Sequence, residues 1–87
     1  MTETLRVLLV EDSESDALLV LRRLRKDGFA PVHERVEDRD TLTAALARQA
    51  WDVVLSDYSL PQFDAIEAFR TVQEHGLDIP FIIISGT

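Results

Sequence analysis

Apolar residues gather in four short runs along the chain, and polar or amphipathic segments separate them. Residues 5–10 (LRVLLV), 53–56 (VVLS) and 81–85 (FIIIS) are nearly continuous aliphatic stretches. Such runs are too short for helices and are typical of strands that are buried on both faces. Residues 31–36 (PVHERV) alternate apolar and polar positions, a weaker signal that favours a strand at the edge of a sheet.

The segments between these runs predict helices. Residues 15–26 place Leu18, Leu21 and Leu24 at helical spacing, and Gly28 stands where that helix would end. A second helix is expected after residues 36–37, capped by an aspartate at position 38 or 40. Its predicted inner face is a set of four residues, Leu42, Ala45, Leu46 and Gln49.

A third helix is predicted before the last apolar run. Asp64 and Glu67 form a variant of the capping box. Ile66, Phe69 and Val72 then recur at helical spacing, and Gly76 marks the end of the helix.

Strands and helices thus alternate in the order βαβαβαβ within one domain, residues 1–87, and no linker or low-complexity segment interrupts them. Strands that alternate with helices of this length predict a parallel sheet with right-handed crossovers, an α/β fold. In such sheets the functional crevice lies at the carboxyl ends of the strands. The residues at those ends are therefore the candidates for function.

Acidic residues and hydroxyls follow three of the four predicted strands. Glu11 and Asp12 follow the first, Asp57 the third, and Ser85 and Thr87 come at the end of the fourth. Carboxylates that share a small site repel one another unless a counter-charge is present. Mg²⁺ prefers oxygen ligands and needs only one or two carboxylates, so this pattern indicates a magnesium site. A carboxylate beside Mg²⁺ can also accept a phosphoryl group, and Ser85 could then hydrogen-bond a phosphoryl oxygen.

The composition excludes several other classes of protein. Sixteen acidic and nine basic side chains give a formal net charge of -7, which argues against nonspecific binding to nucleic acid or to anionic membranes. The chain has no cysteine, so disulfides, thiolate zinc sites and cysteine nucleophiles are excluded. The first apolar run is too short for a signal peptide or a membrane-spanning helix. A cytoplasmic protein is the default expectation.

Three motifs together resemble a known family. EDSESD after the first strand, DYSLPQFDA from the end of the third and FIIISGT at the fourth are similar to the receiver domain of two-component response regulators. The resemblance covers essentially the whole chain. It implies a three-layer, flavodoxin-like (CheY-like) fold with the strand order 2-1-3-4, and a protein that is not an enzyme beyond its own phosphorylation and dephosphorylation.

The resemblance also implies a role for each candidate residue. Asp57 would be the phosphoacceptor, and Mg²⁺ would be bound by Asp12, by Glu11 through water, by Asp57 and by the backbone carbonyl of Ser59. Ser85 would be the switch hydroxyl. Ser59 and Thr87 would tune the lifetime of the phosphoryl group. The expected partners are a sensor histidine kinase or a phosphotransfer protein, which donates from a phosphohistidine, and an effector that the sequence does not identify.

The family pattern continues beyond the fourth strand. The resemblance implies a further helix, strand and helix, with a lysine on the fifth strand that pairs with the phosphoacceptor. Lys26, in the first helix, is the only lysine of the sequence and does not match that position. The sequence is therefore expected to be a receiver domain truncated after the fourth strand. Its uncharged fourth strand would be an exposed sheet edge, so a homodimer or larger oligomer is also expected.

Two other functions remain open at this point. Without the lysine, the chain could be an interaction or dimerisation module that is not phosphorylated. A Mg²⁺-dependent phosphatase of the haloacid-dehalogenase type also uses an aspartate at a strand end. That class requires a second aspartate two positions later, and Ser59 stands there.

Overall fold

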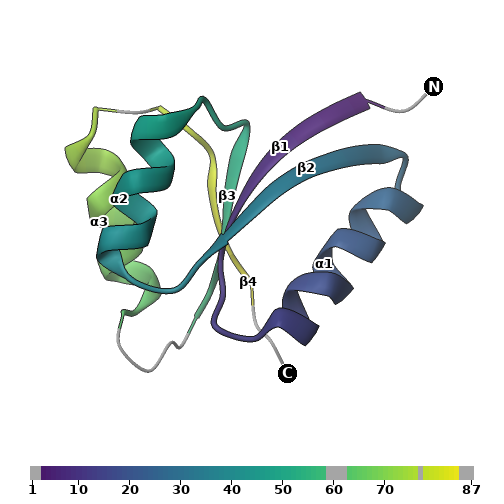
Figure 1. Ribbon diagram of the computed structural model, residues 1–87, viewed down its shortest axis with the longest axis horizontal. Coiled ribbons are helices and arrows are strands. Elements are labelled where there is room, and N and C mark those ends of the chain that lie inside the picture. Colours follow the sequence, from purple (N-terminus) through teal and green to yellow (C-terminus); the bar gives the residue numbers. More distant parts are fainter. Residues whose placement is uncertain (1–2, 59–62, 77, 85–87) are drawn as a thin grey trace.

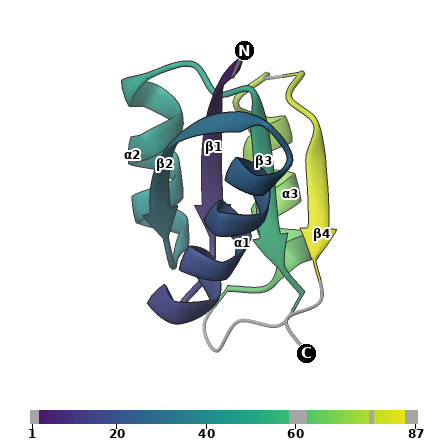
Figure 2. The ribbon, with the colours of Figure 1, turned by 90° about the vertical axis from the view of Figure 1, so that its right-hand side faces the viewer.

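Four parallel strands form one sheet in the computed structural model, which describes residues 3–58, 63–76 and 78–84. The strands are β1 (Glu3–Val10), β2 (Phe29–Val36), β3 (Val53–Asp57) and β4 (Phe81–Ile84). Their order is β2-β1-β3-β4, with all neighbours parallel, and Figure 2 shows them side by side. The predicted α/β architecture and strand order are confirmed.

Three helices cover the two faces of this sheet. They are α1 (Glu14–Lys26), α2 (Arg39–Arg48) and α3 (Ala65–Glu74). Helix α1 lies on one face, and α2 and α3 lie together on the other, so that the molecule has three layers (Figure 1). None of the helices in the described ranges is long and apolar enough to cross a membrane.

The two covered faces of β1 explain why its second half, residues 7–10, is wholly aliphatic. Leu8 and Val10 are buried in the core under α2 and α3, whereas Val7 and Leu9 are buried in the core under α1. Successive side chains of a strand point to opposite faces, so a strand covered on both sides requires apolar residues at every position. β2 lies at the sheet edge and shows the mixed pattern that the sequence predicted.

A capping side chain marks the start of each helix, and the sequence predicted those of α2 and α3. The Ser13 side chain accepts the Asp16 N–H at the start of α1, and Asp38, rather than Asp40, caps α2 in a reciprocal capping box with Thr41. Asp64 accepts the Glu67 N–H at the start of α3. Gly28 and Gly76, which follow the ends of α1 and α3, have φ angles of 99° and 68°, a conformation that glycine adopts without steric cost.

One predicted position on a buried helix face was wrong, and another helix buries small residues in place of large ones. Gln49 is exposed and ends α2, although Leu42, Ala45 and Leu46 are buried as expected. In α3 the buried face consists of Ala65, Ala68, Thr71 and Val72, not of the larger apolar residues Ile66 and Phe69, which are exposed. Small residues let α3 lie close to the sheet, and the Phe69 ring instead packs edge-on against Phe81 of β4.

The outer edge of β4 differs from the other edge of the sheet. Among the described residues β4 pairs with β3 only, and its four residues carry no charge. Ile82 and Ile83, which point to opposite faces, are 49% and 47% exposed. On the β2 edge, by contrast, Glu34 and Arg35 provide charges of the kind that protect natural edge strands.

We therefore expect the 87-residue chain to self-associate through β4, with a sedimentation mass above its 9.9 kDa monomer. Ile82→Lys should shift the mass toward the monomer, because a charge on a strand edge opposes pairing with another strand. Val32→Lys is the matched control, since Val32 is equally exposed, at 49%, on the opposite edge strand. A wild-type chain that sediments as a monomer at all concentrations would contradict this expectation.

Candidate functional site

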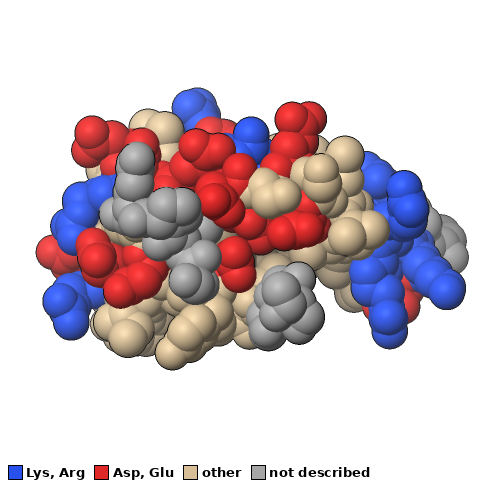
Figure 3. Space-filling model, turned by 90° about the horizontal axis from the view of Figure 1, so that it is seen from below, with Lys and Arg blue, Asp and Glu red and all other residues tan. Residues whose placement is uncertain are grey.

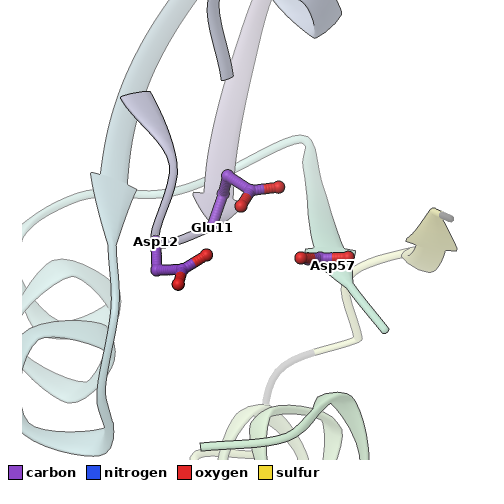
Figure 4. Close-up of side chains that lie close together, drawn as sticks. All are labelled: Glu11, Asp12 and Asp57. Carbon is purple, nitrogen blue, oxygen red and sulfur yellow. The ribbon is translucent and has the colours of Figure 1, made fainter. Parts of the chain in front are cut away.

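Three carboxylates meet where β1 and β3 end. Glu11 and Asp12 directly follow β1, and Asp57 is the last residue of β3. Each offers an oxygen, and these three oxygens lie within 4.8 Å of one another. Figure 4 shows the three side chains pointing toward a common space. The sequence prediction that these residues come together is confirmed.

The backbone around Glu11 is held by hydrogen bonds on both sides. The Glu11 N–H donates to the Val36 carbonyl at 3.0 Å, and the Ser13 N–H donates to the Glu11 carboxylate at 3.0 Å. Ser13 is also the cap of α1, so the loop that carries the two acids is fixed between the end of β1 and the start of a helix. Glu11 is only 3% exposed, whereas Asp12 is exposed.

Asp57 is carried by a rigid strand end. Val54, Leu55 and Ser56 before it are buried, and the Tyr58 N–H donates to the Ile84 carbonyl of β4 at 3.2 Å. Asp57 itself is half-buried. The strand therefore presents one carboxylate to solvent on an anchored backbone, which suits a group that must both bind a cation and react with an incoming substrate.

The electrostatics of the site favour a cation. Burial raises the pKa of Glu11, and the nearby charges of Asp57 and Asp16 and a hydrogen bond with Asp12 raise this pKa further, while the Ser13 N–H acts in the opposite direction. Seen from below, acidic side chains spread across the middle of this end of the molecule, and the basic ones lie largely at its flanks (Figure 3).

The donor set fits a magnesium ion. On an octahedral Mg²⁺, neighbouring ligand oxygens are about 3 Å apart and opposite ones about 4.2 Å apart, so three oxygens within 4.8 Å of one another need only side-chain rotations to bind one ion. All three ligands are hard oxygen donors, which Mg²⁺ prefers. Glu11, Asp12 and Asp57 could therefore hold the ion together with water.

The pKa of Glu11 leads to a prediction on pH. In the unfolded chain Glu11 ionises near its ordinary value of 4.5, and in the folded chain it ionises at a higher pH. The metal-free protein should therefore lose stability as the pH rises from about 4.5 through the raised pKa, because the unfolded state gives up this proton first. Urea unfolding of the wild type and Glu11→Gln across pH 4–8 measures the difference.

Glu11→Gln should lack this part of the pH dependence, and it should be the more stable of the two proteins at pH 7 without metal. Added Mg²⁺ should reduce the gap, because it neutralises the ionised wild-type cluster. If the stability of the two proteins changed with pH in the same way, Glu11 would have the same pKa in the folded and unfolded states, and the prediction would be wrong.

Three predicted site residues lie outside the described residues: Ser59, Ser85 and Thr87. Their predicted roles remain predictions. The sequence interpretation, however, missed Arg35 on β2, because it assigned no comparable chemistry to the end of that strand. The Arg35 guanidinium donates to the carbonyl of Glu11 at 3.2 Å and to the Glu37 carboxylate at 2.6 Å. Arg35 is a single charged residue in an edge strand, and no motif or spacing in the sequence indicated that it would contact this loop.

Comparison with known proteins agrees with this geometry. The family described as "Response regulator receiver domain" matches residues 7–87. The two-component response regulator ORR41 of Oryza sativa subsp. japonica is 30% identical over 84 residues, which cover 94% of this chain and 66% of that protein. The autoinducer 2 sensor kinase/phosphatase LuxQ of Vibrio cholerae is 34% identical over 98% of the chain but only 10% of its own length.

Solved structures show the same fold. The receiver domain of the sensor histidine kinase PA1611 from Pseudomonas aeruginosa, which has a magnesium ion coordinated in its active-site cleft, superimposes with a TM-score of 0.72 at 29% identity, and the match covers 92% of this chain and 66% of that one. The chain thus spans 66% or less of the length of each relative named here. On the evidence of its sequence, sheet order and acidic cluster, the chain belongs to the response regulator receiver domain family.

Proposed function

We propose that this chain is a phosphoacceptor whose Asp57 receives a phosphoryl group in a Mg²⁺-dependent reaction. The observation that carries the proposal is the convergence of Glu11, Asp12 and Asp57 at the carboxyl ends of β1 and β3. The magnesium ion of the PA1611 receiver domain supports a cation at the same place. The donor would be a phosphohistidine on a sensor histidine kinase or on a phosphotransfer protein.

The proposed step balances without any further reactant. A carboxylate oxygen of Asp57 attacks phosphorus, the bond between phosphorus and the imidazole nitrogen breaks, and the leaving imidazole takes up a proton. The product is an acyl phosphate on Asp57. The bound cation supplies positive charge that offsets the phosphoryl oxygens.

The residues of this chain orient the reactants. Asp57 stands on an anchored strand end, so its carboxylate does not have to be ordered at the moment of attack. Glu11 and Asp12 would hold the cation beside the Asp57 carboxylate. We further propose that Ser59 adds a backbone carbonyl to the metal site, that Ser85 hydrogen-bonds the phosphoryl group, and that Ser59 and Thr87 tune its lifetime. Phosphorylation would then change a surface that an effector recognises.

A small-molecule donor tests the proposal. Intact-mass spectrometry after incubation with acetyl phosphate should show one phosphoryl adduct with Mg²⁺ and none with excess EDTA, and peptide mapping should locate the adduct at Asp57. Wild-type protein that binds Mg²⁺ but gains no adduct would indicate an interaction module that is not phosphorylated. Continuous hydrolysis of p-nitrophenyl phosphate would indicate a phosphatase instead.

A further inference from the structure

Arg35 of β2 reaches the loop that carries the two acids of the first strand. In the sheet Arg35 pairs with Leu9, two residues before Glu11. Its guanidinium Nη1 donates to the Glu11 carbonyl at 3.2 Å and to the Asp12 carbonyl at a longer 3.5 Å. The side chain is 30% exposed; its bond to Glu11 is partly buried, whereas its bond to Asp12 is exposed.

These contacts act on the backbone of both acids. With the Val36 carbonyl and the Ser13 N–H, they fix Glu11 at its N–H, its carbonyl and its carboxylate. The direction of a side chain depends on the orientation of its own peptide units, so a donor on these carbonyls limits how far the two carboxylates can turn away from Asp57. Groups outside the direct ligands that orient them in this way commonly change metal affinity by 10- to 100-fold when they are removed.

Arg35 also carries a charge that would oppose a cation. Its partner Glu37 accepts a hydrogen bond from the same nitrogen at 2.6 Å. The opposite charges of the pair largely cancel, so the pair exerts little net repulsion on a cation in the acidic cluster. The hydrogen bonds to the loop are therefore left as the main influence of Arg35 on the site. Positioning and repulsion predict opposite signs for the effect of removing the side chain, so an experiment can separate them.

We infer that Arg35 is a positioning residue that holds the loop after β1 so that Glu11 and Asp12 face Asp57 before a divalent cation binds. This inference rests on the proposed function, because it assumes that the three carboxylates bind Mg²⁺. It adds a contribution from β2, a strand that supplies none of the three carboxylates.

The test measures Mg²⁺ affinity by isothermal titration calorimetry on the full 87-residue chain, with no phosphoryl donor present. Arg35→Met should weaken binding about tenfold, and Arg35→Lys, which keeps one donor group and the charge, should recover part of the loss. Arg25→Met, at an exposed site in α1, is the control and should bind as the wild type does. In the metal-free protein, Arg35→Met should also speed hydrogen exchange of the Ser13 amide.

Glu37→Gln separates positioning from charge, because it leaves the bonds from Arg35 to the loop in place and removes the neutralising carboxylate. It should weaken Mg²⁺ binding less than Arg35→Met does. Weaker binding by Glu37→Gln together with unchanged or tighter binding by Arg35→Met would assign the influence of Arg35 to its charge and overturn the inference.

The remaining outcomes distinguish this inference from the proposed function. Unchanged or tighter Mg²⁺ binding by Arg35→Met, with normal binding by the wild type, would overturn the positioning role alone. Absence of Mg²⁺ binding by the wild type would overturn the proposed function together with the inference that depends on it.

Discussion

Asp57→Asn should abolish the phosphoryl adduct completely while the chain remains folded. The amide has no anionic oxygen to attack phosphorus, and it cannot form an acyl phosphate. Asparagine has nearly the same size as aspartate, so the half-buried position at the end of β3 should accommodate it. Intact-mass spectrometry with acetyl phosphate and Mg²⁺ measures the adduct, and circular dichroism verifies the fold.

The same substitution should change the cluster that remains. The charge of Asp57 is one of the causes that raise the pKa of Glu11, so Asp57→Asn should lower this pKa toward its ordinary value. Mg²⁺ binding should weaken, because one of three carboxylates is lost. Asp78→Asn, an exposed position in the loop before β4, is the matched control for loss of one negative charge. An adduct that persists in Asp57→Asn would mean that another side chain is the acceptor.

The sequence predicted the parts of the site that lie directly at the ends of buried strands. Glu11, Asp12 and Asp57 each follow an aliphatic run, and parallel strands bring their carboxyl ends to one edge. This reasoning needs only the strand order, which the crossover rules and the family resemblance provide. The same logic could not find Arg35, since its contact depends on a side chain that crosses from β2 to the neighbouring loop.

Helix faces were predicted less well than strands for a related reason. In α3 helical spacing marked the large residues Ile66 and Phe69, but the small side chains Ala65 and Ala68 are the ones that are buried. Hydrophobicity alone does not distinguish a residue that fits under a helix from one that packs at its margin, as Phe69 does against Phe81. The distance between layers decides this, and it is a tertiary property.

Leu8→Ala should destabilise the chain more than any other substitution considered for the fold. Leu8 is fully buried in the centre of β1, where it belongs to the core under α2 and α3. Truncating a buried leucine to alanine costs about 2–5 kcal/mol, because apolar contacts are lost and a cavity remains. At about 0.05–0.15 kcal/mol per residue, a chain of this length has only about 4–13 kcal/mol of total stability.

Urea unfolding followed by the fluorescence of buried Trp51 measures this loss. Leu19→Ala is the control, since Leu19 is 59% exposed on α1, and a surface substitution of this kind should change the free energy of unfolding by about 0.5 kcal/mol or less. Saturating Mg²⁺ should recover part of the stability of Leu8→Ala, because an ion that binds only the folded state shifts the equilibrium toward it. Equal destabilisation by the two substitutions would mean that β1 is not at the centre of the core. A firmly packed β1 could then no longer explain how Glu11 and Asp12 are held in place.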